Sequence, residues 1–242
     1  MPKIIGHRGA AGRAPENTLA GFRKAKALGA EWVEFDVRLT RDSRLAVIHD
    51  ADVGRTTNGQ GLVGDTDMSV LAALDAGSWF AGDGGYAGES VPSFEEALAL
   101  LGALGLGANV EVKASAGLEA ESGRRAADVV SRLWREGAPK PLMSSFGPKV
   151  LAAVRDARPD LPRGLLLPRL GRGWQAQARE LDCFSLHCNH MALSRRSVAR
   201  IKDAGFVLLA YTVDEPARAA QLFTWGVDGV ITDLPDKLLA GL

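Results

Sequence analysis

Carboxylate side chains at strand spacing are the first feature of this sequence that could carry chemistry. Glu34 and Asp36 are two residues apart in the apolar run Trp32-Val33-Glu34-Phe35-Asp36-Val37. Because side chains alternate along a strand, both should point to the same face. Two carboxylates are not buried together without a counter-charge, so this run predicts either a bound cation or an internal salt bridge.

A second polar stretch, Asn109-Val110-Glu111-Val112-Lys113, shows the same alternation. Its three polar residues share one face and its two valines share the other. Oxygen ligands from Glu34, Asp36 and Glu111 would satisfy a hard divalent cation. In the alternative interpretation, Lys113 neutralises the carboxylates in a salt-bridge cluster. The spacing alone leaves both open.

Two of the four histidines follow short apolar runs that look like strands. His7 follows one near the N-terminus, and His49 follows another after the paired carboxylates. Histidine can exchange protons near neutral pH. Arg8, next to His7, and Lys113 could bind a phosphate. A metal ion, two histidines and two cations together suit phosphoryl transfer.

Other candidates have weaker signals. Phe146 lies at a strand end and could line a pocket, whereas Phe80 could be either a substrate wall or part of its own segment's core. Asp233 could be a helix cap or a partner of the site. The run His187-Cys188-Asn189-His190 lacks a fourth zinc ligand at convincing spacing. The cysteine of this run, Cys188, and the nearby Cys183 are both expected to be free thiols.

The elements around these residues alternate between short apolar runs and helical patterns, which is typical of βα units on a parallel sheet. Strands are expected near 3–7, 31–37, 45–49, 108–113, 141–145, 163–167, 182–187, 206–212 and 228–232. Helices are expected near 16–28, 93–104, 118–136, 147–157, 173–180, 194–204, 215–225 and 235–241.

One of the nine strands is extra. Only residues 40–44 separate the second run from the third, which is too short for a parallel crossover and favours an antiparallel hairpin. Setting 45–49 aside leaves eight strands and eight helices, an α/β fold of the (β/α)8 TIM-barrel class with a hairpin and insertion after the second strand. A length of 242 residues suits one such domain, 1–242.

Residues 50–92 form the insertion, with Gly82-Asp83-Gly84-Gly85 as a flexible piece. We expect it to cover the C-terminal face of the barrel as a lid or subdomain. The chain has 29 basic and 29 acidic residues, which argues against a nucleic-acid partner. Neither a signal-like start nor an apolar run of about 18 residues is found, so we predict a cytoplasmic protein without membrane insertion.

Motifs spread along the chain resemble those of the glycerophosphodiester phosphodiesterases, most nearly the cytoplasmic bacterial type. Each motif alone is weak, but together and in order they are specific. They are His7-Arg8-Gly9, Pro15-Glu16-Asn17-Thr18, Glu34-Phe35-Asp36-Val37, Val47-Ile48-His49-Asp50, Arg55-Thr56-Thr57-Asn58-Gly59, Val91-Pro92-Ser93, Asn109-Val110-Glu111-Val112-Lys113, Ser144-Ser145-Phe146, Tyr211-Thr212-Val213-Asp214 and Gly226-Val227-Asp228-Gly229.

The resemblance implies a TIM-type barrel that binds one divalent cation, Mg2+ or Ca2+. It implies hydrolysis of a small-molecule glycerophosphodiester, such as glycerophosphocholine or glycerophosphoethanolamine, to sn-glycerol 3-phosphate and an alcohol. Either water attacks directly or a cyclic phosphate forms first. The implied roles are metal binding by Glu34, Asp36 and Glu111, acid-base catalysis by His7 and His49, and phosphate binding by Arg8 and Lys113.

The chain departs from the family pattern at Tyr211 and Asp214, where many members have Trp and Asn. Tyr211 is expected at the pocket wall, so the shape of the pocket and the alcohol preference are open. Two alternative functions remain. One is a lysophospholipase D-like activity on lysophospholipids, which needs an apolar trough, and the other is a non-catalytic phosphodiester-binding barrel.

Overall fold

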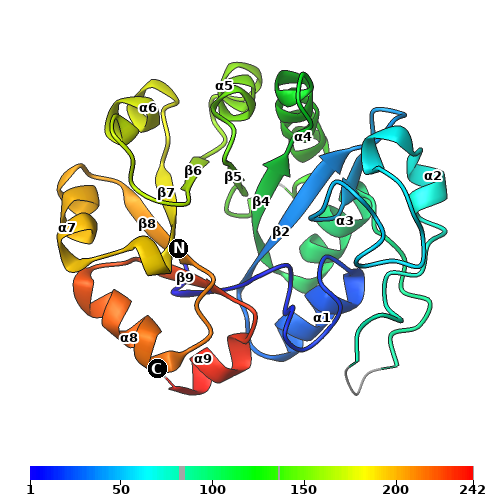
Figure 1. The fold of residues 1–242 in the computed structure, drawn as a ribbon, viewed down its shortest axis with the longest axis horizontal. Coiled ribbons are helices and arrows are strands. Elements are labelled where there is room, and N and C mark those ends of the chain that lie inside the picture. The colour runs from blue at the N-terminus through cyan, green and yellow to red at the C-terminus, as the bar shows by residue number, and fades with distance from the viewer. Residues whose placement is uncertain (82–84, 136, 242) are drawn as a thin grey trace.

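A closed barrel of eight parallel strands forms the centre of the molecule (Figure 1). The computed structural model describes residues 1–81, 85–135 and 137–241. The strand order is β1-β9-β8-β7-β6-β5-β4-β2, and pairing of β1 with β2 closes the barrel, which confirms the predicted TIM barrel. The strands are β1 Ile4–Gly6, β2 Trp32–Leu39, β4 Gly107–Lys113, β5 Leu142–Ser145, β6 Arg163–Leu167, β7 Ser185–Asn189, β8 Val207–Tyr211 and β9 Gly229–Thr232.

The extra strand, β3 Leu45–Val47, pairs antiparallel with the end of β2, as the short link predicted. Thr40 closes the turn: its backbone N–H donates to the Arg44 carbonyl at 2.9 Å, and its hydroxyl to Asp42 at 2.5 Å. The hairpin therefore sets where the chain leaves the barrel, two residues before His49.

In the part of the chain that the structure describes, eight α-helices surround the barrel, and a ninth, short one lies in the insertion (Figure 1). The predicted first helix begins later than expected, because Thr18 is its N-cap and accepts from the Gly21 N–H; Glu16 and Asn17 therefore lie in the preceding loop. The predicted helix 118–136 ends at Leu133, and residue 136 lies outside the described residues. The helices are α1 Leu19–Ala27, α2 Met68–Leu71, α3 Phe94–Leu104, α4 Glu119–Leu133, α5 Pro148–Ala157, α6 Trp174–Glu180, α7 Arg195–Asp203, α8 Pro216–Trp225 and α9 Pro235–Gly241.

The strand alternation separates the core from the site. Val33, Phe35 and Val37 of β2 pack outward with the helix layer. A small apolar cluster of Ile5, Leu142, Leu209 and Ile231 forms on the other faces of the strands. Glu34 and Asp36 alternate with the outward residues of β2, so both carboxylates point inward and share one face of the strand, as predicted from their spacing.

The described residues of the insertion, 50–81 and 85–92, lie beside β2, β3 and α3 rather than across the barrel mouth (Figure 1). The insertion has its own core, so it packs as a flank, and the expectation that it covers the C-terminal face is not met in its described part. Gly82, Asp83 and Gly84 of the predicted flexible piece lie outside the described residues. The apolar residues of this core are Ala46, Ile48, Val53, Val63, Met68, Leu71, Ala76 and Val91.

None of the described helices is both long enough and apolar enough to cross a bilayer.

Candidate active site

A cavity of about 310 Å³ opens at the C-terminal ends of the strands, where TIM-barrel sites are built. Its lining brings together most of the residues singled out in the sequence. Asp36 is only 1% exposed and lies below the surface of the cavity. The predicted site residues that line it are His7, Arg8, Glu34, His49, Glu111, Lys113, Phe146 and Tyr211.

The three carboxylates predicted to bind metal meet at this cavity. Parallel pairing places Glu34 opposite Asn109, and Asp36 opposite Glu111. Ligand atoms of Glu34, Asp36 and Glu111 lie within 4.8 Å of one another, and all three residues are buried. Among the residues that the structure describes, they are the only group of three or more His, Cys, Asp or Glu side chains placed so that they could hold a metal ion.

The electrostatics of this triad fit a bound cation. Burial, followed by the charge of Asp36, raises the pKa of Glu34 to about 8. Burial and the same neighbour also raise the pKa of Glu111. The Oδ1 atom of Asn109 is buried without a hydrogen-bond partner among the described residues. A divalent cation with oxygen ligands would answer both the excess negative charge and the unpaired oxygen.

Lys113 also forms the alternative salt bridges. Its Nζ lies 2.5 Å from Glu111 Oε1 and 3.2 Å from Asp36 Oδ1. Burial opposes the charge on Lys113, but Asp36 and Glu111 outweigh it and raise the pKa of the ammonium. One ammonium cannot neutralise three carboxylates, so the salt bridges and a cation site are compatible.

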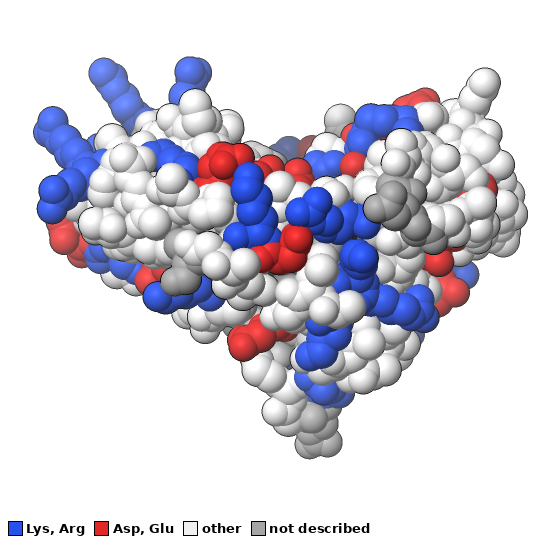
Figure 2. Space-filling model, turned by 90° about the horizontal axis from the view of Figure 1, so that it is seen from below, with Lys and Arg blue, Asp and Glu red and all other residues white. Residues whose placement is uncertain are grey.

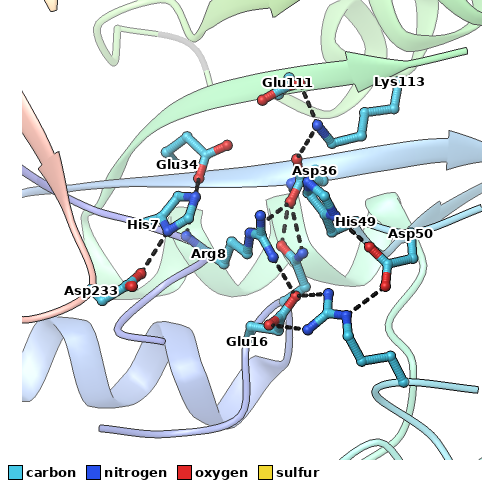
Figure 3. Close-up of polar contacts among 12 residues, drawn as sticks. His7, Arg8, Glu16, Glu34, Asp36, His49, Asp50, Glu111, Lys113 and Asp233 are labelled. Atoms are coloured by element: carbon cyan, nitrogen blue, oxygen red, sulfur yellow. Dashed lines mark hydrogen bonds and ion pairs between the residues drawn. The ribbon is translucent and has the colours of Figure 1, made fainter. Parts of the chain in front are cut away.

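His7 is oriented by a partner from the far end of the chain (Figure 3). Its Nδ1 lies 2.6 Å from Asp233 Oδ1, and its Nε2 is 3.9 Å from Glu34 Oε2. Burial alone lowers the pKa of His7, but the hydrogen bond to Asp233 and the charge of Glu34 outweigh it and raise the pKa. Asp214 holds Asp233 in turn by accepting its backbone N–H at 2.8 Å, so this departure from the family pattern keeps an acceptor there.

His49 is oriented in a similar way from the hairpin side of the cavity. Its Nδ1 lies 2.6 Å from Asp50 Oδ1, and its carbonyl accepts from Arg38 Nε at 2.7 Å. Burial lowers the pKa of His49, and the charge of Asp36 offsets this only in part. Both histidines are thus held through one ring nitrogen, which leaves the other free to exchange protons.

The loop after β1 carries two residues with unusual backbones. Arg8 (φ 48°) and Asn17 (φ 56°) are left-handed, a conformation that persists at functional sites despite its cost. Arg8 Nη1 donates to Glu16 Oε1 at 2.7 Å, and Arg8 Nε lies 3.4 Å from Asp36 Oδ2. Asn17 donates to Asp36 Oδ2 at 2.9 Å and so supports the carboxylate.

The aromatic candidates separate into two groups. Phe146 and Tyr211 line the cavity and pack edge to face with ring centroids 6.1 Å apart. Phe80 instead packs between Trp79 and Tyr86 in the insertion, both 5.8 Å away. It does not line the cavity, so of its two interpretations the structure favours the insertion's own packing.

The remaining histidine and cysteine candidates do not form a site. His187 is fully buried, and its Nε2 lies 3.0 Å from Ser185 Oγ. Both Cys183 and Cys188 are free thiols, as predicted. Burial raises the pKa of each to about 12, so neither is a thiolate at neutral pH.

Known proteins resemble this chain over nearly its whole length. Residues 7–237 match the glycerophosphoryl diester phosphodiesterase family. The chain is 35% identical to a glycerophosphodiester phosphodiesterase of Caldanaerobacter subterraneus subsp. tengcongensis, over 98% of this chain and 96% of the relative. It is 32% identical to one of Bacillus subtilis, over 96% of this chain and 83% of the relative.

Solved structures agree. A phosphodiesterase of Oleispira antarctica, in complex with the product sn-glycerol-3-phosphate, is similar with a TM-score of 0.95 and 36% identity, covering 100% of this chain and 96% of that chain. A glycerophosphodiester phosphodiesterase of Agrobacterium tumefaciens is similar with a TM-score of 0.83 and 29% identity, covering 99% and 100%. The chain therefore belongs to the glycerophosphodiester phosphodiesterase family of enzymes across its whole length.

Proposed function

We propose that this enzyme hydrolyses glycerophosphodiesters, such as glycerophosphocholine or glycerophosphoethanolamine, to sn-glycerol 3-phosphate and an alcohol, with one bound Mg2+ or Ca2+. The observation that carries the proposal is the meeting of two carboxylate-held histidines, two cations and a buried carboxylate triad in one cavity. The product bound by the similar Oleispira antarctica enzyme supports the identity of the phosphate-containing product.

Each side chain has a role in this proposal. Glu34, Asp36 and Glu111 hold the ion, which when bound supplies positive charge that polarises the phosphoryl oxygens. His7 and His49 move the protons, one to the leaving oxygen and one from the attacking group, which is either water or a glycerol hydroxyl. Arg8 and Lys113 bind the phosphate oxygens, and Phe146 and Tyr211 line the wall beside them.

A paired assay tests the proposed substrate class against the alternative on lysophospholipids. Purified enzyme with Mg2+ or Ca2+ is given glycerophosphocholine or lysophosphatidylcholine, and choline release is measured. We expect turnover of the deacylated substrate to dominate, since the cavity is small and no described residue of 50–92 lines it. Faster release from lysophosphatidylcholine would overturn the proposal in favour of the lysophospholipase D activity.

A further inference from the structure

Arg55 stands out in the insertion because of its charge. It is the only Lys or Arg among residues 50–92, which contain seven Asp and Glu residues. Its side chain is 46% exposed, and ion pairs of such exposed groups usually contribute little to stability. A well-ordered set of contacts at this position therefore points to a role other than stability.

The guanidinium of Arg55 contacts two carboxylates at once. Its Nη1 and Nη2 donate to the two oxygens of Glu16 at 2.9 and 2.8 Å, which is a bidentate pair. Its Nε donates to Asp50 Oδ2 at 2.5 Å. These hydrogen bonds raise the pKa of Arg55 and contribute to lowering that of Asp50.

Each of these carboxylates also holds a group of the cavity through its second contact. Asp50 uses its other oxygen to bind His49 Nδ1 at 2.6 Å. Glu16 accepts from Arg8 Nη1 at 2.7 Å. Arg55 therefore links the histidine on the hairpin side to the arginine on the β1 side, although neither touches the other.

We propose that Arg55 is a positioning residue for the proposed hydrolysis, on which this inference rests. Its guanidinium fixes the carboxylates of Asp50 and Glu16, and these carboxylates in turn hold the side chains of His49 and Arg8 in position on either side of the cavity. His49 needs such support because it follows the three-residue strand β3 at the base of the insertion. Small displacements of catalytic groups can cost about 10²-fold in rate.

The test compares Arg55→Gln and Arg55→Lys with Arg41→Gln on glycerophosphocholine. Arg41 is a matched control, because it forms the same bidentate pair with Asp67 at 2.9 and 2.7 Å, outside the cavity. We expect Arg55→Gln to lower kcat about 10- to 100-fold. In Arg55→Lys, the ammonium is a point charge that cannot hold both carboxylates, so its kcat should lie between those of Arg55→Gln and wild type. The Tm of Arg55→Gln, and its metal affinity measured without substrate, should both match those of Arg41→Gln.

A double variant separates positioning from a general structural effect. Asp50→Asn should lower kcat as well, and the pair with Arg55→Gln should lose little more than the worse single variant. A wild-type kcat in Arg55→Gln, or additive losses in the double variant, would overturn the inference. An inactive wild-type enzyme would instead overturn the proposed function itself.

A second feature, independent of Arg55, is a basic arc on the opposite side of the mouth. We define it as Arg169, Arg172, Arg195 and Arg196, which are all exposed and lie in the segments that follow β6 and β7. Segments 168–173 and 190–196 contain no Asp or Glu. Figure 2 shows basic side chains standing out on one side of the hollow between the two lobes.

The arc continues the less acidic wall of the cavity. Phe146, Leu166, Asn189 and Tyr211 line the cavity on β5 to β8, whereas the carboxylate triad lies on β2 and β4. The part of a substrate that extends from the bound phosphate along this wall would approach the arc. Positive charge there attracts anions and repels cations such as choline.

We infer that, among the glycerophosphodiesters that the enzyme hydrolyses, those whose alcohol carries a negative charge have a higher kcat/KM than glycerophosphocholine or glycerophosphoethanolamine, an inference that also rests on the proposed function. The test compares glycerophosphoinositol 4-phosphate with glycerophosphoinositol, which differ by one phosphate. The ratio of their kcat/KM values should exceed 1 at low salt and fall as salt screens the arc. The double variant Arg195→Gln/Arg196→Gln should lower this ratio of kcat/KM values about 3- to 10-fold at low salt.

The matched control removes two charges from the other end of the barrel. Lys26→Gln/Arg132→Gln changes exposed residues near the C-terminal ends of α1 and α4, so the ratio should stay at the wild-type value. A ratio that does not respond to salt, or equal ratios in the two double variants, would overturn the inference. No turnover of either substrate would count against the proposed function instead.

Discussion

Replacing Glu34 with Gln should stabilise the metal-free protein, although it removes a metal ligand. Burial, and then the charge of Asp36, raises the pKa of Glu34 from 4.5 to about 8. A carboxyl group whose pKa is raised on folding destabilises the folded state above the unfolded pKa. The loss therefore begins near pH 4.5 and grows until the pH passes the folded value near 8.

The size of the effect follows from the shift. Each pKa unit corresponds to about 1.36 kcal/mol, so the penalty in the metal-free protein is at most about 5 kcal/mol. Gln keeps an oxygen for the Arg8 N–H, which donates to Glu34 Oε2 at 3.0 Å, but it is still a buried polar group. We therefore expect a gain of about 2 kcal/mol at pH 8, or about 4–8 °C in Tm for a chain of this size.

The assay is thermal unfolding in EDTA at pH 5 and pH 8, followed by circular dichroism. Glu180→Gln, which removes an exposed carboxylate on α6, is the control. The difference in Tm between Glu34→Gln and wild type should be small at pH 5 and reach several degrees at pH 8. Added Mg2+ or Ca2+ should then stabilise wild type more than the variant. A variant less stable than wild type at pH 8 in EDTA would refute the reasoning.

Four further changes have definite expected outcomes. His49→Ala should lower kcat by about 10²–10⁴ in initial-rate assays. Asp233→Asn removes the negative charge from the hydrogen-bond partner that raises the pKa of His7, so one limb of the pH–rate profile should move to lower pH. Burial lowers the pKa of His187 to about 3. The free energy of unfolding of the wild type should therefore fall by up to about 5 kcal/mol as the pH is lowered from 6.5 towards 3, and that of His187→Gln should fall less, as measured by urea titration. Gly164→Ala puts a Cβ 2.5 Å from His187 Nε2 and should cost about 1–3 kcal/mol in urea titrations. The four expectations would be contradicted, respectively, by an unchanged kcat in His49→Ala, an unmoved pH–rate profile in Asp233→Asn, an acid sensitivity of His187→Gln equal to that of wild type, and an unchanged stability in Gly164→Ala.

The barrel and the inward carboxylates could be predicted because local patterns determine them. The short link 40–44 allowed only a hairpin, which identified β3 as the extra strand. Alternation placed Glu34 and Asp36 on one face of β2, and Glu111 on the polar face of β4, and strand pairing brings these two faces together. Strand ends similarly placed His7 and His49 at the mouth of the barrel.

The contacts that orient these residues could not be predicted, because they depend on barrel closure and loop packing. His7 and Asp233 are 226 residues apart and meet only because β9 lies beside β1. Arg55 was part of a recognised motif, but its partner Glu16 is 39 residues away in another loop. The insertion has its own apolar core, and its composition gave no sign of which side of the mouth it would occupy.

The central claim is that the carboxylate triad binds a divalent cation that glycerophosphodiester hydrolysis requires. The most direct measurement titrates Mg2+ or Ca2+ into EDTA-treated enzyme with glycerophosphocholine and follows sn-glycerol 3-phosphate. We expect no product without the ion, saturable recovery with it, and a weaker half-saturation in Glu111→Gln. Full activity in EDTA, or no product at any ion concentration, would contradict the claim.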